Sequence, residues 1–215
     1  NSFVLFLEYI KKIGKMVSVM KQLFKILEFV TAFFQLNILW LLFCLPVLTI
    51  FPATVAMYCV IRQWVLHKDY SVFRSFFQYF KENFKQSFIL GIIWIVFAGV
   101  FYLDFMLMKN LGTFQYILLP VLSLIGIVII FITIFIFSTI ANYNVNWLTA
   151  IKNSLFFSVR YFFVTLSVLV LFVLMVLILY TWSVTFLFIF CVFAFCNYYL
   201  CHLVFNKIQS VQTSK

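Results

Sequence analysis

Four long stretches without a charged residue constrain this chain more than any other feature of its sequence. They cover residues 29–61, 86–103, 110–151 and 161–206. A helix crosses a hydrocarbon core of about 30 Å with about 20 apolar residues, because only a helix or a closed barrel satisfies its backbone hydrogen bonds there. The last stretch, 46 residues long, would form a rod of roughly 70 Å as one helix, so it must fold back. The chain is therefore predicted to be a polytopic α-helical membrane protein.

The composition excludes a water-soluble domain. Hydrophobic residues make up 67% of the chain and charged residues only 9%, against about 45–50% and about 25% in soluble domains. The 15 basic and 5 acidic residues are too few to cover a polar exterior. Disordered, coiled-coil, collagen-like and disulfide-scaffold chains are excluded too, since each needs a polar, periodic or cysteine-rich sequence.

We expect an all-α fold with about six transmembrane helices, at residues 29–46, 52–66, 86–108, 116–141, 162–180 and 184–205. Pro46 and Pro52 predict a hairpin between the first two spans, because proline ends one helix and is tolerated in the first turn of the next. Thr54 and Trp40 lie beside this hairpin and are expected to be structural. The second span is short, so a re-entrant pair buried among other helices is the alternative.

The positions of lysine and arginine predict the orientation. Six crossings with both termini in the cytoplasm put 14 of these residues in inner segments and only Lys109 in an outer loop, as expected where basic residues gather in cytoplasmic loops. This indicates a multi-pass protein of a bacterial cytoplasmic membrane. The net charge of +10 then reflects topology and attraction to the lipid bilayer. Nucleic-acid binding is not expected, since the charges are spread over several membrane-proximal loops.

Amphipathic segments precede three of the spans. In residues 71–85, phenylalanines lie on one side and polar residues on the other, including the elbow-helix residues Arg74, Lys81, Asn83 and Lys85. Such a helix suits the membrane interface, as a connector or in a membrane-binding role. Residues 3–25 and 146–160 show similar patterns. One interpretation is a three-fold repeat of an elbow helix plus two spans; low residue identity between the units favours three unrelated connectors.

These patterns divide the chain into a basic amphipathic N-terminal segment (1–25), a single transmembrane helical domain (26–206) and a short cytoplasmic tail (207–215).

Asp104, Asn37 and Gln35 form the candidate intramembrane polar site. A carboxylate inside a span is costly, so Asp104 must face other helices or water. It would serve as a cation, proton or substrate site, or else as a near-surface group satisfied by Lys109 or water. Buried amides, among them Asn37 and Asn197, most often join helices by hydrogen bonds.

Other small and aromatic residues in the spans predict packing. Gly91 and Gly99 place a small-residue stripe on the third span, where another helix can approach. Trp40 and Trp94 are expected to pack between helices, whereas Trp64 is expected in the interfacial aromatic belt.

No pattern of residues predicts catalysis. The sequence has no phosphate-binding loop, no metal-binding His-Glu-x-x-His motif and no paired carboxylates, so we expect no enzyme, no metal and no cofactor. The five cysteines all fall in predicted spans and are interpreted as small buried apolar residues.

Three short blocks, in order and spacing, are similar to the YesL-like family of bacterial integral membrane proteins, known as a domain of unknown function. The first holds residues 37–43, Leu45-Pro46, Phe51-Pro52-Ala53-Thr54 and Arg62-Gln63-Trp64; the second holds residues 73–77 and 80–85; the third is Tyr102-Leu103-Asp104. The resemblance covers roughly residues 20–205. It implies that Met16 is the natural start and that residues 1–15 are an upstream extension.

The resemblance also implies a link with carbohydrate utilisation and with sugar-importing ABC transporters, and it supplies no catalytic residue. The leading hypothesis is therefore a non-enzymatic accessory or assembly factor that contacts the permease subunits of a carbohydrate importer. The alternative is a small autonomous transporter or channel for a small solute. A third possibility is a lipid-organising protein. The sequence leaves the oligomeric state open.

Overall fold

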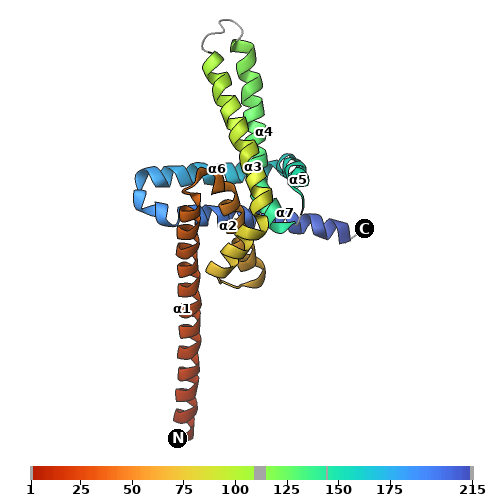
Figure 1. The fold of residues 1–215 in the computed structure, drawn as a ribbon. Helices are drawn as coiled ribbons and strands as arrows, with labels where there is room; N and C mark the ends of the chain where they lie inside the picture. Colours follow the sequence, from red (N-terminus) through yellow and green to blue (C-terminus); the bar gives the residue numbers. More distant parts are fainter. Residues whose placement is uncertain (1, 109–114, 144, 214–215) are drawn as a thin grey trace.

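The computed structural model describes residues 2–108, 115–143 and 145–213, and these residues form helices without any strand (Figure 1). In chain order the elements are α1 (Ser2–Cys44), the short 3-10 helix η1 (Val47–Thr49), α2 (Ile50–His67), α3 (Phe73–Met108), α4 (Gln115–Asn142), α5 (Trp147–Arg160), α6 (Phe162–Thr181), the 3-10 helix η3 (Ser183–Leu187) and α7 (Ile189–Thr213). The predicted all-α fold is confirmed.

Among the described residues, six helical segments are long and apolar enough to cross a membrane. They are Gly14–Cys44, Val47–His67, Phe73–Met106, Leu119–Asn142, Phe162–Thr181 and Ile189–Ile208. The predicted number of spans is therefore confirmed, and most predicted ends lie within a few residues of the observed ones. The last span begins later than expected because η3 occupies the residues after the α6 turn.

Helix α2 is the centre of the packing. In the most apolar 18-residue window of Val47–His67, 67% of the residues are buried, against 11% in that of Phe73–Met106. Helices α1, α3, α4 and α7 all contact α2. Small side chains such as Ala53 and Ala56, both fully buried, allow this close approach.

The predicted proline hairpin is confirmed. Pro46 precedes η1 at its N-cap position, and Pro52 lies in the first turn of α2, where a missing backbone N–H does no harm. The Thr49 hydroxyl contacts the carbonyls of Phe43 at 2.5 Å and Pro46 at 2.7 Å. The Phe43 carbonyl is one of those that the end of α1 leaves without a partner within the helix.

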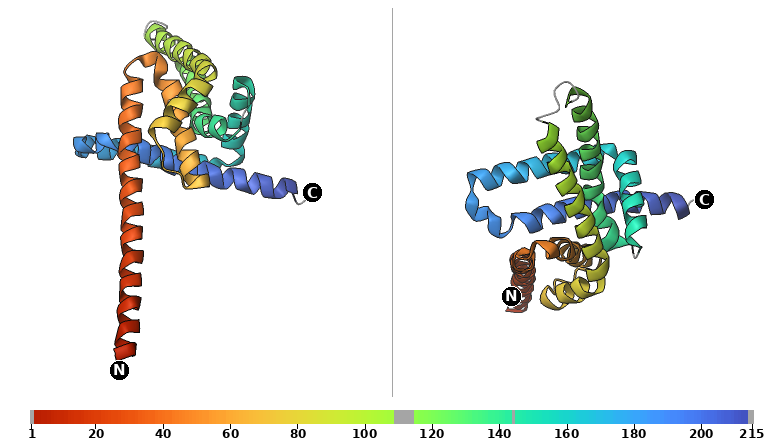
Figure 2. Two further views of the ribbon diagram at one scale, coloured as in Figure 1. Left: turned by 60° about the horizontal axis from the view of Figure 1, so that its bottom comes forward. Right: turned by 45° about the horizontal axis from the view of Figure 1, so that its top comes forward.

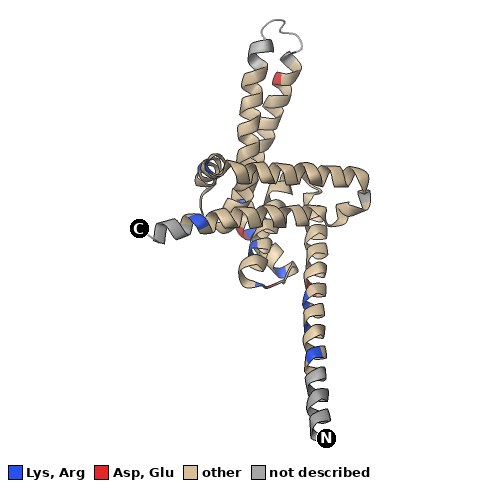
Figure 3. Cartoon of the chain, turned by 180° about the vertical axis from the view of Figure 1, so that it is seen from behind, with Lys and Arg blue, Asp and Glu red and all other residues tan. Residues whose placement is uncertain are grey.

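The helices do not form one parallel bundle. The hairpin of α3 and α4 stands upright in Figure 1, and the hairpin of α6 and α7 crosses it at a steep angle; Figure 2 shows the same crossing from another side. The N-terminal half of α1 extends away from all other helices. Figure 3 shows the basic residues along α1, around the connection of α2 and α3, and toward the C-terminus of α7. Lys109 lies outside the described residues.

The elbow helices differ from the expectation in two of three places. Helix α3 continues from Phe73 to Met108 without the turn expected near residue 86, and α1 continues through residues 3–25 into the first span. Neither helix contains a proline that would break its hydrogen-bond ladder. Both helices therefore stay continuous, and the repeat of a separate elbow helix before each pair of spans is not observed. Helices α1 and α7 also run without a break through the boundaries at 25/26 and 206/207.

The third elbow helix is a separate element, as predicted. Helix α5 ends at Arg160, and Tyr161 leaves the helical conformation (φ −112°, ψ 50°) before α6 begins. The Thr165 hydroxyl, fully buried, donates a hydrogen bond to the Ser158 carbonyl at 2.9 Å. This bond satisfies one of the carbonyls at the end of α5 and stabilises the bend. Asn146 occupies the N-cap position of α5 without a side-chain hydrogen bond.

Candidate functional site: an apolar cavity among five helices

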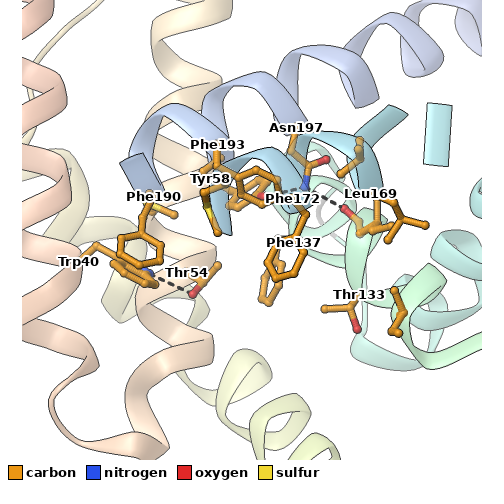
Figure 4. A pocket seen from close by; sticks show the side chains of 16 residues that line it. Trp40, Thr54, Tyr58, Thr133, Phe137, Leu169, Phe172, Phe190, Phe193 and Asn197 are labelled. Atoms are coloured by element: carbon orange, nitrogen blue, oxygen red, sulfur yellow. Dashed lines mark hydrogen bonds between the residues drawn. The ribbon is translucent and has the colours of Figure 1, made fainter. Parts of the chain in front are cut away.

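A cavity of about 470 Å³ lies where α1, α2, α4, α6 and α7 meet, and it opens at the helix surface (Figure 4). Its walls come from every one of these helices: Trp40, Thr54, Met57, Tyr58, Ile130, Thr133, Ile134, Phe137, Val168, Leu169, Phe172, Met175, Phe190, Phe193, Ala194 and Asn197. This volume lies within the range of small-molecule sites, roughly 300–1,000 Å³. The cavity is therefore the candidate functional site.

Aromatic rings shape the walls of the cavity. Trp40 on α1 lies 4.9 Å from Phe190 on α7, measured between ring centroids, and Phe172 on α6 lies 5.8 Å from Phe193. Tyr58 on α2 lies 5.6 Å from Phe137 on α4. Each pair joins two helices at a distance that favours tilted or edge-to-face packing. These ring pairs therefore form walls of the cavity at three helix contacts.

Asn197 is the main polar group of the cavity wall. Its side-chain nitrogen donates to the Tyr58 hydroxyl oxygen at 2.8 Å and to the Ile134 carbonyl at 3.3 Å. Because the Ile134 carbonyl can only accept a hydrogen bond, it must face the amide nitrogen of Asn197, which fixes the orientation of this side chain. The Cys201 thiol then donates to the amide oxygen at 3.3 Å. Asn197 thus joins α7 to α2 and α4, as expected for a buried amide in a span.

The indole N–H groups of two tryptophans donate hydrogen bonds to threonine hydroxyls. Trp40 donates to the Thr54 hydroxyl at 3.1 Å, which joins α1 to α2, and Trp94 donates to the Thr133 hydroxyl at 3.0 Å, which joins α3 to α4. Both threonines donate in turn to carbonyls of their own helices at 2.7 Å. The prediction that Trp40 and Trp94 pack between helices is confirmed, and Trp40 and Thr54 also line the cavity.

The structure separates the three residues of the predicted polar site. Asn37 is fully buried, donates to the Phe186 carbonyl at 3.2 Å and accepts from the Cys191 backbone N–H at 3.1 Å. Gln35, two positions earlier, is exposed. Asp104 is half-buried near the end of α3. None of the three lines the cavity, and pairing of Asp104 with Lys109 lies outside the described residues.

The predicted elbow residues divide into two groups. Arg74, Lys81 and Lys85 are exposed on the first half of α3, as an interfacial polar face requires. Asn83 instead faces inward, where its amide donates to the Tyr79 carbonyl at 3.0 Å and contacts the Cys59 sulfur at 3.9 Å. Asn83 therefore contributes to the packing of α3 on α2.

The loop between α2 and α3 is organised by Asp69. Its carboxylate accepts from the Ser71 backbone N–H at 3.0 Å and from the Gln63 side chain at 2.5 Å. The Ser71 backbone bond, the largest effect, lowers the pKa of the Asp69 carboxyl below its ordinary value, because it favours the ionised form. Lys68, just before it, adopts the left-handed conformation (φ 54°) that ends many helices.

The polar side chains of the cavity walls bond within the protein. They are hydroxyls, an indole and an amide, and they bond to one another or to carbonyls. Within the described part of the chain, no group of three or more His, Cys, Asp or Glu side chains could hold a metal ion. The cavity can enclose an apolar molecule, and its walls hold few polar groups to which such a molecule could form a hydrogen bond.

Sequence reasoning missed most residues of the cavity. Tyr58, Phe137 and Phe172 come from three different helices, and no spacing along the chain indicates that they meet. Asn197 was recognisable as a polar residue in a span. A search for amides in spans could therefore have found one wall of the cavity.

Comparisons with known proteins found a matching family and two similar proteins. Residues 33–105 match the family described as "Protein of unknown function, DUF624". The uncharacterized protein YteU of Bacillus subtilis (strain 168) is 29% identical over 148 residues, which are 67% of each chain. The uncharacterized protein YesL of the same organism is 33% identical over 115 residues, 52% of this chain and 54% of YesL. No solved structure matches. The predicted resemblance is thus confirmed: residues 33–105 match the DUF624 family, and the chain is similar to YesL and YteU.

Proposed function

We propose that this protein is a non-enzymatic integral membrane protein that acts as an accessory or assembly factor for a carbohydrate uptake system of the ABC importer type. The carbohydrate part of the proposal rests on the resemblance to the YesL-like family. The accessory role rests on how the chain uses its polar side chains.

The observation that carries this proposal is the apolar cavity with internally bonded walls. A path for a sugar or an ion needs polar groups that can replace the hydration of the solute. Here Asn197, Trp40 and Thr54 already bond to other groups of the protein. The same walls lack a nucleophile with a base beside it, which catalysis requires. Binding to other membrane components is the activity that remains.

Two exposed surfaces support contact with a membrane partner. The described side chains from Met16 to Leu27 on α1 include large apolar ones, such as Phe24 at 66% exposure, and Figure 1 shows that no other helix covers them. The outer face of α6 is similarly apolar. Helices associate in lipid through close packing of such faces, so a permease helix is a suitable partner for the outer face of α6.

The protein is proposed to lie in the bacterial cytoplasmic membrane with both termini in the cytoplasm. The support is the distribution of lysine and arginine along the sequence. A reporter enzyme that works only in the cytoplasm is expected to be active when it is fused after Lys215. An externally accessible reporter at that position would refute the orientation.

The accessory role is tested by purification and by uptake. The tagged protein, solubilised in a mild detergent, is expected to bring down permease subunits of a sugar importer, and deletion of its gene is expected to lower sugar uptake. An unrelated six-span protein with the same tag is the control. Equal recovery of permease with the control, or normal uptake in the deletion strain, would contradict the proposal.

A small solute transporter is the second candidate, and the size of the cavity is the observation that favours it. Purified protein in liposomes should then conduct a solute, and Asn197→Leu should reduce the flux because it removes the main polar group of the wall. The flux should also depend on Asp104 if that carboxylate lies on the path. Absence of any flux, or flux unchanged by both Asn197→Leu and Asp104→Asn, eliminates this candidate.

A further inference from the structure

Tyr58 presents an unused hydrogen-bond donor to the apolar cavity. Its side chain is 3% exposed and lines the cavity wall, and its oxygen accepts a hydrogen bond from Asn197 at 2.8 Å. Because the Ile134 carbonyl fixes the amide nitrogen toward Tyr58, the tyrosine proton must point elsewhere. Among the described residues it has no acceptor.

The other polar groups of the wall are already engaged. The hydroxyls of Thr54 and Thr133 donate to carbonyls of their own helices, and the Trp40 indole donates to Thr54. All residues that line the cavity belong to the described part of the chain. The Tyr58 proton is therefore the one side-chain donor of these walls without an acceptor in the described residues, and a buried donor without a partner is costly.

The cavity opens at the surface of helices that lipid must cover. Two residues of its lining, Ile130 and Phe172, are 49% and 47% exposed, so a ligand enters from the bilayer and must be soluble there. We infer that the cavity binds a neutral apolar chain or ring that carries one hydrogen-bond-accepting oxygen, with this oxygen bound to the Tyr58 hydroxyl. A phospholipid ester and a free lipid-soluble carbonyl compound share this chemistry.

A charged or multiply hydroxylated ligand does not fit these walls. Lys, Arg, Asp and Glu are absent from the lining, and a buried charge or an unpaired hydroxyl would lose its hydration without compensation. Aromatic and methionine side chains from opposite walls, such as Phe137, Phe172 and Met175, offer contacts to a chain or a flat ring instead. This inference goes beyond the accessory role and does not depend on it.

Two probes that share a sixteen-carbon chain test the hydrogen bond. Methyl palmitate and hexadecane are added to the purified full chain in nonionic detergent, and bound probe per chain is measured by native mass spectrometry. Methyl palmitate should bind more tightly than hexadecane to the unaltered protein. Tyr58→Phe should weaken methyl palmitate roughly 2- to 12-fold, the range of one net hydrogen bond, and leave hexadecane unchanged. Tyr180→Phe, at an 88% exposed position, is the matched control.

A second pair of variants tests the place of binding. Ala194→Leu adds bulk to the cavity wall at a fully buried position, whereas Ala98→Leu makes the same change on an exposed face of α3. Only Ala194→Leu should reduce binding of both probes. Should that variant fail to fold, Tyr58→Phe still decides, since it retains the ring and the bond of Asn197 to Ile134. Equal affinity of the two probes for the unaltered protein, or no effect of Tyr58→Phe on the ester, overturns the inference.

Lipid extracted from the purified protein identifies the natural source. A phospholipid that is retained by the unaltered protein and lost from Ala194→Leu supports an ester ligand, and a retained neutral carbonyl lipid supports a free one. Identical lipid content in both proteins overturns the inference. These measurements involve no permease, so they can fail while the accessory role stands, and the reverse also holds.

Discussion

Asn37 provides the sharpest test of how the helices are joined. It is fully buried on α1, and its amide donates to the Phe186 carbonyl and accepts from the Cys191 backbone N–H. Cys191 is the third residue of α7, and the first N–H groups of a helix have no partner within it. Asn37 therefore caps α7 from another helix, and Asn37→Leu should loosen the contact of α1 with the α6–α7 hairpin.

The expected loss follows from the two broken bonds. Each hydrogen bond between membrane helices contributes about 0.6 kcal/mol on average and up to about 1.7 kcal/mol. Asn37→Leu also leaves a buried N–H and a carbonyl unpaired, which costs about 1–3 kcal/mol for each group that water or relaxation does not rescue. We therefore expect a decrease of about 2–4 kcal/mol in the free energy of unfolding.

The measurement is reversible unfolding in mixed micelles titrated with sodium dodecyl sulfate, followed by circular dichroism. Gln35→Leu is the matched control, because it removes an amide from an exposed position of the same helix and should change the free energy by less than about 0.5 kcal/mol. A loss for Asn37→Leu no greater than that for Gln35→Leu would refute the assigned role of Asn37.

Two further predictions concern the loop and the contact of α2 with α3. Because the pKa of the Asp69 carboxyl is lowered in the folded chain, its ionised form stabilises the loop fully at pH values above the pKa of the unfolded chain, and this stability is lost as the pH falls through the folded-state pKa. Asp69→Asn should therefore remove the acid dependence of the protection of the loop in hydrogen exchange. An unchanged acid dependence in this variant would contradict the prediction. An added Cβ at Gly91 would lie 3.3 Å from the Cβ of Phe51, whereas Gly99 has nothing within 4 Å, so Gly91→Leu should destabilise the protein by about 1–3 kcal/mol in the same unfolding assay and Gly99→Leu should be nearly neutral.

Hydrophobic length and proline positions were enough to predict the spans. The uncharged stretches gave the number of helices because lipid leaves the backbone few alternatives. Pro46 and Pro52 marked the hairpin because proline limits where a helix can continue. The stripe predicted from Gly91 and Gly99 was right only at Gly91, since the approach of α2 ends before α3 reaches Gly99.

Lateral neighbours could not be predicted from one sequence. Trp64 was expected in the interfacial belt, but it is 3% exposed and its ring packs against Phe29, Phe33 and Tyr70, with centroids 6.1, 5.1 and 6.2 Å away. Rings from α1 and the loop after α2 cover Trp64, while its place in the interfacial belt stays a prediction. Sequence gives the depth of a residue in a span but not which helix lies beside it.

The candidate polar site also shows that one sequence does not indicate which residues of a span face other helices. Asn37 and Gln35 lie two residues apart, which places them about 200° apart around the helix. One amide therefore enters the protein core while the other faces outward. Asn37 faces inward because the Cys191 backbone N–H of α7 needs an acceptor. These two residues lie 154 positions apart in the sequence.

The use of polar groups connects the fold with the proposed binding properties. Inside a membrane protein, each buried donor or acceptor must find its partner within the protein, and Asn37, Asn197, Trp40 and Trp94 do so by joining helices. Groups committed to these bonds cannot also recognise a ligand without breaking the packing. The cavity can therefore select by shape and apolar contact, with Tyr58 as its one point of polar discrimination. Such a site suits the ligand inferred above, a molecule that already dissolves in the bilayer.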